Sequence, residues 1–373
     1  MRSRVEITMA LLMSSVLVAG CAGVDRAKRT VPSTVVASEG LPFAIRRVAV
    51  EPKTIDVRLS QEVTIQYELT HPANVVIDIV DEDGVVVRRL REDRQEAGPH
   101  QMRWDGRDTN EARVASGVYR YSIRADSLVS SNRQSVTYDP STDTGGEKLS
   151  PRDFVWDAAA NRFRWIMPKA ARARLRVGLN EFPHLRTLLD WEPLEGGAQE
   201  LAWDGLDASG LIRVEEHPER SVKLVAFALA PNTIIVRGEL PDPPTNPLTR
   251  RQRRQGFSHA DHPRATCHEV RFRVEFPGAT ADAEGRPQLS GVVSVRVWLD
   301  EREAVHLVNE RFDIMLFVDL TIIVEEGEGS NPYTYLWDTT HIPSGPHLLT
   351  VNVLGYADHF GVVTQPVLIG SPS

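Results

Sequence analysis

The chain of 373 residues lacks the residues and runs on which several protein classes depend. Its two cysteines are too few for a disulfide framework, and the Cys-x-x-Cys-His motif of haem attachment is absent. Its formal net charge of −8 argues against nucleic acid as a partner. The apolar run at residues 7–18 is shorter than the ~20 residues of a membrane-spanning helix, and no other stretch reaches that length. With 41% hydrophobic and 25% charged residues, the composition indicates folded protein, in about two to four domains.

Motifs of enzymes are missing as well. The sequence contains no Gly-x-Ser-x-Gly nucleophile turn, no glycine-rich phosphate loop and no His-Glu-x-x-His zinc motif. Its 51 acidic residues form no pair that sequence order places in a pocket. We therefore expect a protein that is not an enzyme and that binds neither a cofactor nor a metal.

The N-terminus has the order of a secretory signal peptide. Basic residues precede the apolar run, and small residues then lead to Cys21. Residues 18–21, Val-Ala-Gly-Cys, resemble the lipobox of bacterial lipoproteins, which implies cleavage before Cys21 and lipid on that cysteine. Ala22, where inner-membrane lipoproteins carry aspartate, implies sorting to the outer membrane, facing either side of it. We expect a signal peptide at residues 1–20 and a flexible tether at 21–43.

Short strands with period-two alternation occupy the rest of the chain. In residues 63–69, apolar side chains alternate strictly with polar ones, the pattern of a half-buried strand. Short strands separated by turn residues are typical of a β-sandwich. The sequence predicts an all-β chain of tandem immunoglobulin-like β-sandwiches joined by linkers. The expected boundaries are 44–126 for domain 1, 127–153 for a linker, 154–238 for domain 2, 239–265 for a Pro/Arg-rich linker and 266–370 for domain 3.

A Trp-Asp turn recurs in the three units. Trp-Asp-Gly-x-Asp occurs twice, and Trp-Asp-Thr-Thr takes its place in the third unit. We expect the tryptophan to fill the end of each sandwich and the aspartate to accept hydrogen bonds from its own turn. Calcium binding is the alternative, but two carboxylates supply too few oxygens for that ion. The motif residues are Trp104, Asp105, Gly106, Asp108, Trp203, Asp204, Gly205, Asp207, Trp337 and Asp338.

The first unit carries further motifs around this turn. They are Asp83-Gly84, Gly98-x-His100, Trp104 to Asp108 and Ser116-Gly117-Val118-Tyr119. Together these motifs resemble the immunoglobulin-like module of the flagellar hook-capping protein, over residues 44–125 and more loosely over 155–237. Because such modules act as spacers or interaction units, the resemblance implies a non-catalytic role.

Two groups of arginines have a binding and a structural interpretation. Arg172, Arg174 and Arg176 lie on one face of a predicted strand, opposite its apolar residues, and Arg250 and Arg251 lie in the linker 239–265. Such clusters can bind phosphate or an anionic glycolipid through charge-assisted hydrogen bonds. The structural interpretation is a solvated sheet face, or a protected sheet edge, and a soluble linker.

Two further features are also open to both interpretations. His259, His262, Cys267 and His268 offer nitrogen and sulfur ligands for zinc or copper, but their spacing matches no standard finger, which favours a chance cluster. Trp298 lies on the outer face of its predicted strand, where it either packs between domains or stacks on a sugar ring.

Two functions follow from these expectations. The favoured one is a lipid-anchored cell-envelope protein that serves as a structural scaffold or as an interaction module for another envelope protein. The alternative is a surface lipoprotein that binds a glycan or an anionic polymer through its arginines and Trp298. In both, the N-terminal lipid is the contact with the membrane.

Overall fold

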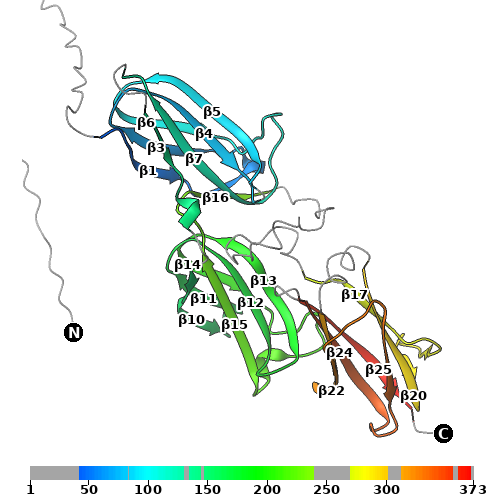
Figure 1. Ribbon diagram of the computed structural model, residues 1–373. Helices are drawn as coiled ribbons and strands as arrows, with labels where there is room; N and C mark the ends of the chain where they lie inside the picture. Colours follow the sequence, from blue (N-terminus) through cyan, green and yellow to red (C-terminus); the bar gives the residue numbers. More distant parts are fainter. Residues whose placement is uncertain are drawn as a thin grey trace, which may run out of the picture. The chain divides into compact units, whose positions relative to one another are not determined.

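The computed structural model describes residues 42–82, 84–129, 134–143, 147–238, 269–300, 312–355 and 360–370. These ranges consist mainly of β-strands that form three sandwiches, which confirms the predicted fold class (Figure 1). Across the described ranges, no helix combines the length and the apolar character needed to cross a bilayer. Several predicted features lie outside the described residues, the signal peptide among them. The single residues outside them are Cys21, Asp83, Arg250, Arg251, His259, His262, Cys267 and His268.

The first sandwich packs a three-stranded sheet, ordered β1-β3-β6, against a six-stranded sheet. The larger sheet has the order β2-β16-β7-β4-β5, and β8 also pairs with β7. Its strands are β1 (Ile45–Glu51), β2 (Thr54–Asp56), β3 (Val63–Leu69), β4 (Ala73–Val80), β5 (Val86–Gln95), β6 (Gly98–Trp104), β7 (Gly117–Ser127), β8 (Ser135–Tyr138) and β16 (Thr233–Arg237). Two short 3-10 helices, η1 (Val57–Leu59) and η2 (Pro140–Asp143), lie in its connections.

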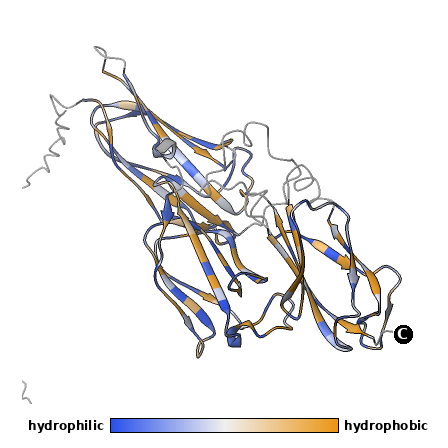
Figure 2. Ribbon diagram, turned by 60° about the horizontal axis from the view of Figure 1, so that its bottom comes forward, coloured by the Kyte–Doolittle hydropathy of each residue, from blue (hydrophilic) through white to orange (hydrophobic). Residues whose placement is uncertain are grey.

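The alternation read from the sequence produces the core of this sandwich. In β3 the four apolar residues Val63, Ile65, Tyr67 and Leu69 are all buried, while the polar residues between them face away. The same interleaving of apolar and polar residues is visible along the strands in Figure 2. Each strand therefore contributes one face to a core closed by the opposite sheet.

One strand of the first sandwich comes from the end of the predicted second domain. β16 pairs antiparallel with residues 117–120 of β7 and parallel with β2. Its residues Ile234 and Val236 are part of the first core, so the strand is integral to that sandwich. The structure thus corrects the predicted boundary of domain 2 at 238. The chain returns to the first sandwich after about residue 230 (Figure 1).

The second sandwich lies within the interval 147–230. Its sheets have the orders β10-β11-β14 and β13-β12-β15-β9. The strands are β9 (Lys148–Leu149), β10 (Arg152–Asp157), β11 (Arg162–Met167), β12 (Ala171–Leu179), β13 (His184–Leu194), β14 (Gly197–Ala202) and β15 (Arg220–Ala228), with a 3-10 helix η3 (Val214–Glu216). β12 is buried along nearly its whole length because it is central in its sheet and carries apolar residues on its core face.

The third sandwich consists of a three-stranded sheet, β17-β20-β23, and a six-stranded sheet, β18-β19-β25-β24-β21-β22. Its strands are β17 (Phe272–Glu275), β18 (Thr280–Ala281), β19 (Pro287–Leu289), β20 (Val292–Leu299), β21 (Phe312–Val318), β22 (Thr321–Glu326), β23 (Tyr333–Asp338), β24 (Gly345–Gly355) and β25 (Phe360–Ile369). The inward residues of β20, β21 and β24 supply most of its core.

Candidate functional site

The first Trp-Asp turn is closed by its own backbone. Trp104 is buried and its indole N–H donates to the carbonyl of Arg107 at 2.8 Å. Asp105 accepts the N–H of Arg107 at 3.2 Å, and Asp108 accepts those of Asn110 and Ala112 at 2.8 and 2.9 Å. Both carboxylates therefore satisfy turn N–H groups that no strand partner could reach.

The second turn repeats this geometry with stronger burial. The Trp203 indole donates to the Leu206 carbonyl at 2.9 Å, and Asp204 accepts the N–H of Leu206 at 3.1 Å. Asp207 is 1% exposed and accepts the N–H groups of Leu211 and Ile212, each at 2.9 Å. Gly205 adopts a φ of +81°, a left-handed conformation that glycine supplies without strain.

The third turn, which lacks the glycine, is built differently. Trp337 is buried, and Asp338 accepts both the N–H and the hydroxyl of Thr340, at 3.0 and 2.7 Å. Thr339, at the glycine position, donates its N–H and its hydroxyl to the Gly291 carbonyl. Searching the described ranges reveals no group of three or more His, Cys, Asp or Glu residues placed to hold a metal ion.

The arginine row of β12 faces neighbouring sandwiches. Arg172 forms an ion pair with Glu82 of the first sandwich at 2.8 Å, with side-chain exposures of only 3% and 6%. Glu82 also accepts the N–H of Val118 at 2.8 Å, and Arg172 donates to the Trp191 carbonyl at 3.1 Å. Removing either member of this buried pair would leave the other charge buried without its partner, which is costly.

The other two arginines of the row stack on aromatic rings. The Arg174 guanidinium lies 4.8 Å from the ring centroid of Trp191, in the same sandwich. That of Arg176 lies 4.6 Å from the ring of Phe360, in the third sandwich, and 4.0 Å from Asp190. The structure therefore corrects the expectation of a solvated face, since both Arg172 and Arg176 are buried.

The contact of the second and third sandwiches also contains a paired amide and two shifted titratable groups. The Asn352 side chain accepts the N–H of His184 at 3.0 Å and donates to its carbonyl at 2.9 Å, as a neighbouring strand would. Burial lowers the pKa of His184 to about 4, assisted by the positive charge of Arg176. Burial raises the pKa of Glu269 to about 7, and the charge of Asp190 adds to this rise against the opposing effect of Arg176.

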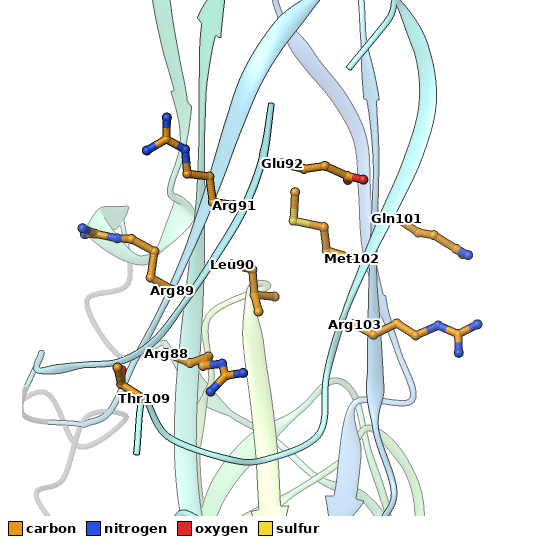
Figure 3. A pocket seen from close by; sticks show the side chains of 9 residues that line it. All are labelled: Arg88, Arg89, Leu90, Arg91, Glu92, Gln101, Met102, Arg103 and Thr109. Carbon is orange, nitrogen blue, oxygen red and sulfur yellow. The ribbon is translucent and has the colours of Figure 1, made fainter. Parts of the chain in front are cut away.

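An open groove of about 500 Å³ runs between the edge strands β5 and β6 of the first sandwich. Figure 3 shows Leu90, Glu92 and Met102 directed into the space between the two strands, with Arg89 and Arg91 directed away on one side. The rest of the lining consists of Arg88, Gln101, Arg103 and Thr109.

The arginines of this groove pair with surface carboxylates. Each of the four arginines forms an ion pair with a nitrogen–oxygen distance between 2.6 and 3.0 Å. The pairs are Arg88 with Glu111, Arg89 with Asp78, Arg91 with Asp93 and Arg103 with Glu62. Charged side chains along an edge strand discourage pairing with other chains, so the row protects the edge of the sheet.

Trp298 is half-buried on the outer face of β20. The guanidinium groups of Arg273 and Arg296 lie 5.2 and 5.9 Å from its ring centroid. The tryptophan is thus engaged by cation–π contacts within its own sandwich.

The sequence did not predict Glu82 and Trp191 as partners of the β12 arginines. It also did not predict β16 as a strand of the first sandwich. Glu82 and Trp191 carry no local pattern that distinguishes them from surface residues. A signal for β16 was present, because Thr-Ile-Ile-Val after Pro231 is a short apolar run of the kind typical of a strand buried on both faces.

Comparisons with solved structures give similarities at low identity. A tetra-tandem repeat from the extending region of a large adhesion protein is 13% identical, covers 88% of this chain and 75% of its own, and has a TM-score of 0.20. Dimeric latent PorU from Porphyromonas gingivalis is 8% identical over 88% of this chain and 34% of its own, with a TM-score of 0.20. A 1.5-MDa bacterial ice-binding adhesin is 11% identical over 89% of this chain and 99% of its own, with a TM-score of 0.18.

No curated protein sequence matches the chain. One protein-family model does, and it covers the strands from β2 to β7 and the first Trp-Asp turn. Residues 53–128 match the FlgD Ig-like domain, which confirms the resemblance predicted from the motifs of the first unit.

Proposed function

We propose that this protein is a lipid-anchored scaffold of the cell envelope that presents an interaction surface away from the outer membrane. The family match of residues 53–128 to an immunoglobulin-like domain indicates a non-catalytic structural or interaction module. The lipobox ending at Cys21 supports the anchor, and Ala22 supports the outer membrane as its site. The partner we propose is another envelope protein, bound by the sandwiches beyond the tether.

The observation that carries this proposal is the use of β12 to join the sandwiches. A single strand directs Arg172 toward Glu82 of the first sandwich and Arg176 toward Phe360 of the third. Ordinary surface arginines on flexible modules would stay in water, where an ion pair contributes only about 0–1 kcal/mol. Burial of these arginines at contacts between sandwiches favours a protein whose sandwiches are held together, as a scaffold requires.

The anchor is tested by fractionating cells that express the wild-type chain or a Cys21→Ser variant, after labelling with a clickable palmitate analogue. We expect label and outer-membrane recovery for the wild type, and loss of both for the variant. Label retained by Cys21→Ser, or a wild-type chain without label, would refute the lipid anchor. Chemical crosslinking in intact cells then asks whether one envelope protein is recovered with the wild type and lost with the unanchored variant.

A second function, binding of an anionic polymer, is favoured by the groove between β5 and β6. Four arginines line it, and their partners are surface carboxylates that a polyanion could replace. The test is retention on a heparin column. Retention that falls with Arg89→Ala/Arg91→Ala/Arg103→Ala would support this function, and retention unchanged from wild type would exclude the groove as its site.

A further inference from the structure

The chain path makes the second sandwich an insertion in the first. The first sandwich is formed by residues that precede β9 and is completed by β16, which follows β15. The chain therefore enters the first sandwich at β1 and finally leaves it at β16, and residues 147–230 form a loop between two of its strands. The last described residues before position 239 therefore belong to the first sandwich.

We propose that the first sandwich carries mechanical tension along the chain and that the second sandwich is shielded from it. The direction of pull, from the tether toward the third sandwich, rests on the proposed function. While the first sandwich is intact, tension entering at β1 and leaving at β16 passes through its sheets and core, without loading the covalent chain of residues 147–230. The second sandwich keeps its fold, and any surface it presents, under load.

The pairing of β2 with β16 suits this role. The two strands are parallel, with Ile235, Val236 and Arg237 opposite Thr54, Ile55 and Asp56. The N-terminal end of one parallel strand and the C-terminal end of its neighbour lie at opposite ends of the pair. Pulling β2 from its N-terminal side and β16 from its C-terminal side therefore loads their hydrogen bonds together, in shear, instead of one after another.

Burial and hydrogen bonds hold β16 in place. Ile234, Ile235 and Val236 are buried, and the N–H of Ile235 donates to the Lys53 carbonyl at 2.8 Å. At the start of the strand, Asn232 is fully buried; its carbonyl accepts the N–H of Tyr121 at 3.1 Å, and its side-chain amide donates to the Tyr121 carbonyl at 2.7 Å. Asn232 and Tyr121 are both buried, so their two hydrogen bonds are shielded from water.

Single-molecule pulling tests the proposal. The full chain, with Cys21→Ser and Cys267→Ser, is stretched by handles at its two ends. Opening the first sandwich releases about 110 residues, or about 400 Å of chain, and opening the second releases about 85 residues, or about 300 Å. We expect the second-sandwich event only after the first-sandwich event, in every trace. The third sandwich can open at any point of the trace.

A disulfide between β7 and β16 identifies the events. Val118 and Ile235 are opposite residues, and because the N–H of Ile235 points to Lys53, they form a closely spaced pair that does not exchange hydrogen bonds. In Val118→Cys/Ile235→Cys, the oxidised bond encloses residues 147–230. The ~300 Å event should disappear, the first event should shorten by roughly a quarter, and reduction should restore both.

Two results would overturn the proposal. One is a ~300 Å event, sensitive to the disulfide, that precedes opening of the first sandwich. The other is failure of the Val118→Cys/Ile235→Cys variant to form its disulfide under oxidising conditions, seen as persistence of the ~300 Å event, which would mean that β16 does not lie opposite β7. Because the pulled chain carries no lipid, either outcome is independent of the Cys21 fractionation that tests the anchor.

Discussion

Gly106 occupies a backbone position in the first Trp-Asp turn that other residues could adopt only with strain. Its φ is +73°, in the left-handed region. A Cβ added there would lie 2.4 Å from the Cγ1 of Val57, a buried residue of η1. The motif glycine thus allows the turn to pack directly on the segment that follows β2.

Gly106→Ala should destabilise the first sandwich by about 2–4 kcal/mol, because the left-handed conformation and the collision with Val57 both add cost. Denaturant unfolding monitored by tryptophan fluorescence measures this loss. Gly84→Ala is the matched control, since Gly84 has a φ of +79° but no atom within 4 Å of an added Cβ. The control should lose only about 1–2 kcal/mol. Equal losses in the two variants would contradict the packing argument.

At the scale of elements, β12 joins the sandwiches through its arginines. Arg172→Met would leave Glu82 buried without its cation, and removing one partner of a buried pair typically costs about 3–5 kcal/mol. We expect this loss in the unfolding free energy measured by denaturant titration. The double variant Arg172→Met/Glu82→Gln should recover much of it, because no charge stays buried and Gln can still accept from Val118.

The matched control for that experiment is Arg91→Ala. Arg91 pairs with Asp93, and both side chains are more than half exposed. Such a surface pair contributes about 0–1 kcal/mol, so the variant should unfold close to wild type. A loss for Arg172→Met as small as for Arg91→Ala would show that the ion pair with Glu82 does not hold the sandwiches together.

The elements that the sequence predicts well are those whose pattern is local. Alternation in β3 identifies both the strand and its buried face, and the Trp-Asp turns carry their own capping aspartates. Alternation also places Arg172 and Arg176 correctly on the side of β12 opposite the core. It cannot show that another sandwich covers that side, because this depends on contacts between residues far apart in sequence. The same holds for β16, whose apolar run predicts a strand but not the sheet that accepts it.

At the scale of the whole molecule, the contact of the second and third sandwiches should respond to pH. Glu269 has a pKa near 7 in the folded chain, above its ordinary value of 4.5, mainly through burial and then through Asp190. Between these values the folded chain retains a proton that the unfolded chain has lost, so the contribution of Glu269 to stability falls as pH rises from about 4.5 to 7. His184 acts in the opposite direction, since its pKa is lowered to about 4 and its contribution rises toward pH 6.5.

Glu269→Gln should separate the pH-dependent contributions of Glu269 and His184 to the free energy of unfolding. The variant removes the falling contribution and leaves that of His184, so its unfolding free energy relative to wild type should increase steadily between about pH 5 and pH 7. Urea titrations of both proteins at several pH values measure the difference. A difference that does not change with pH would mean that Glu269 is not held in a buried, carboxylate-flanked position.

β16 belongs to the first sandwich, and the second sandwich is an insertion between its strands. Native-state hydrogen exchange of the amides of Ile234, Ile235 and Val236 tests this arrangement most directly, with Gly106→Ala as the perturbation. We predict that this variant lowers the protection of these amides together with that of β7 and leaves β15 unchanged. If the amides of β16 kept their protection, or followed those of β15, this arrangement would be contradicted.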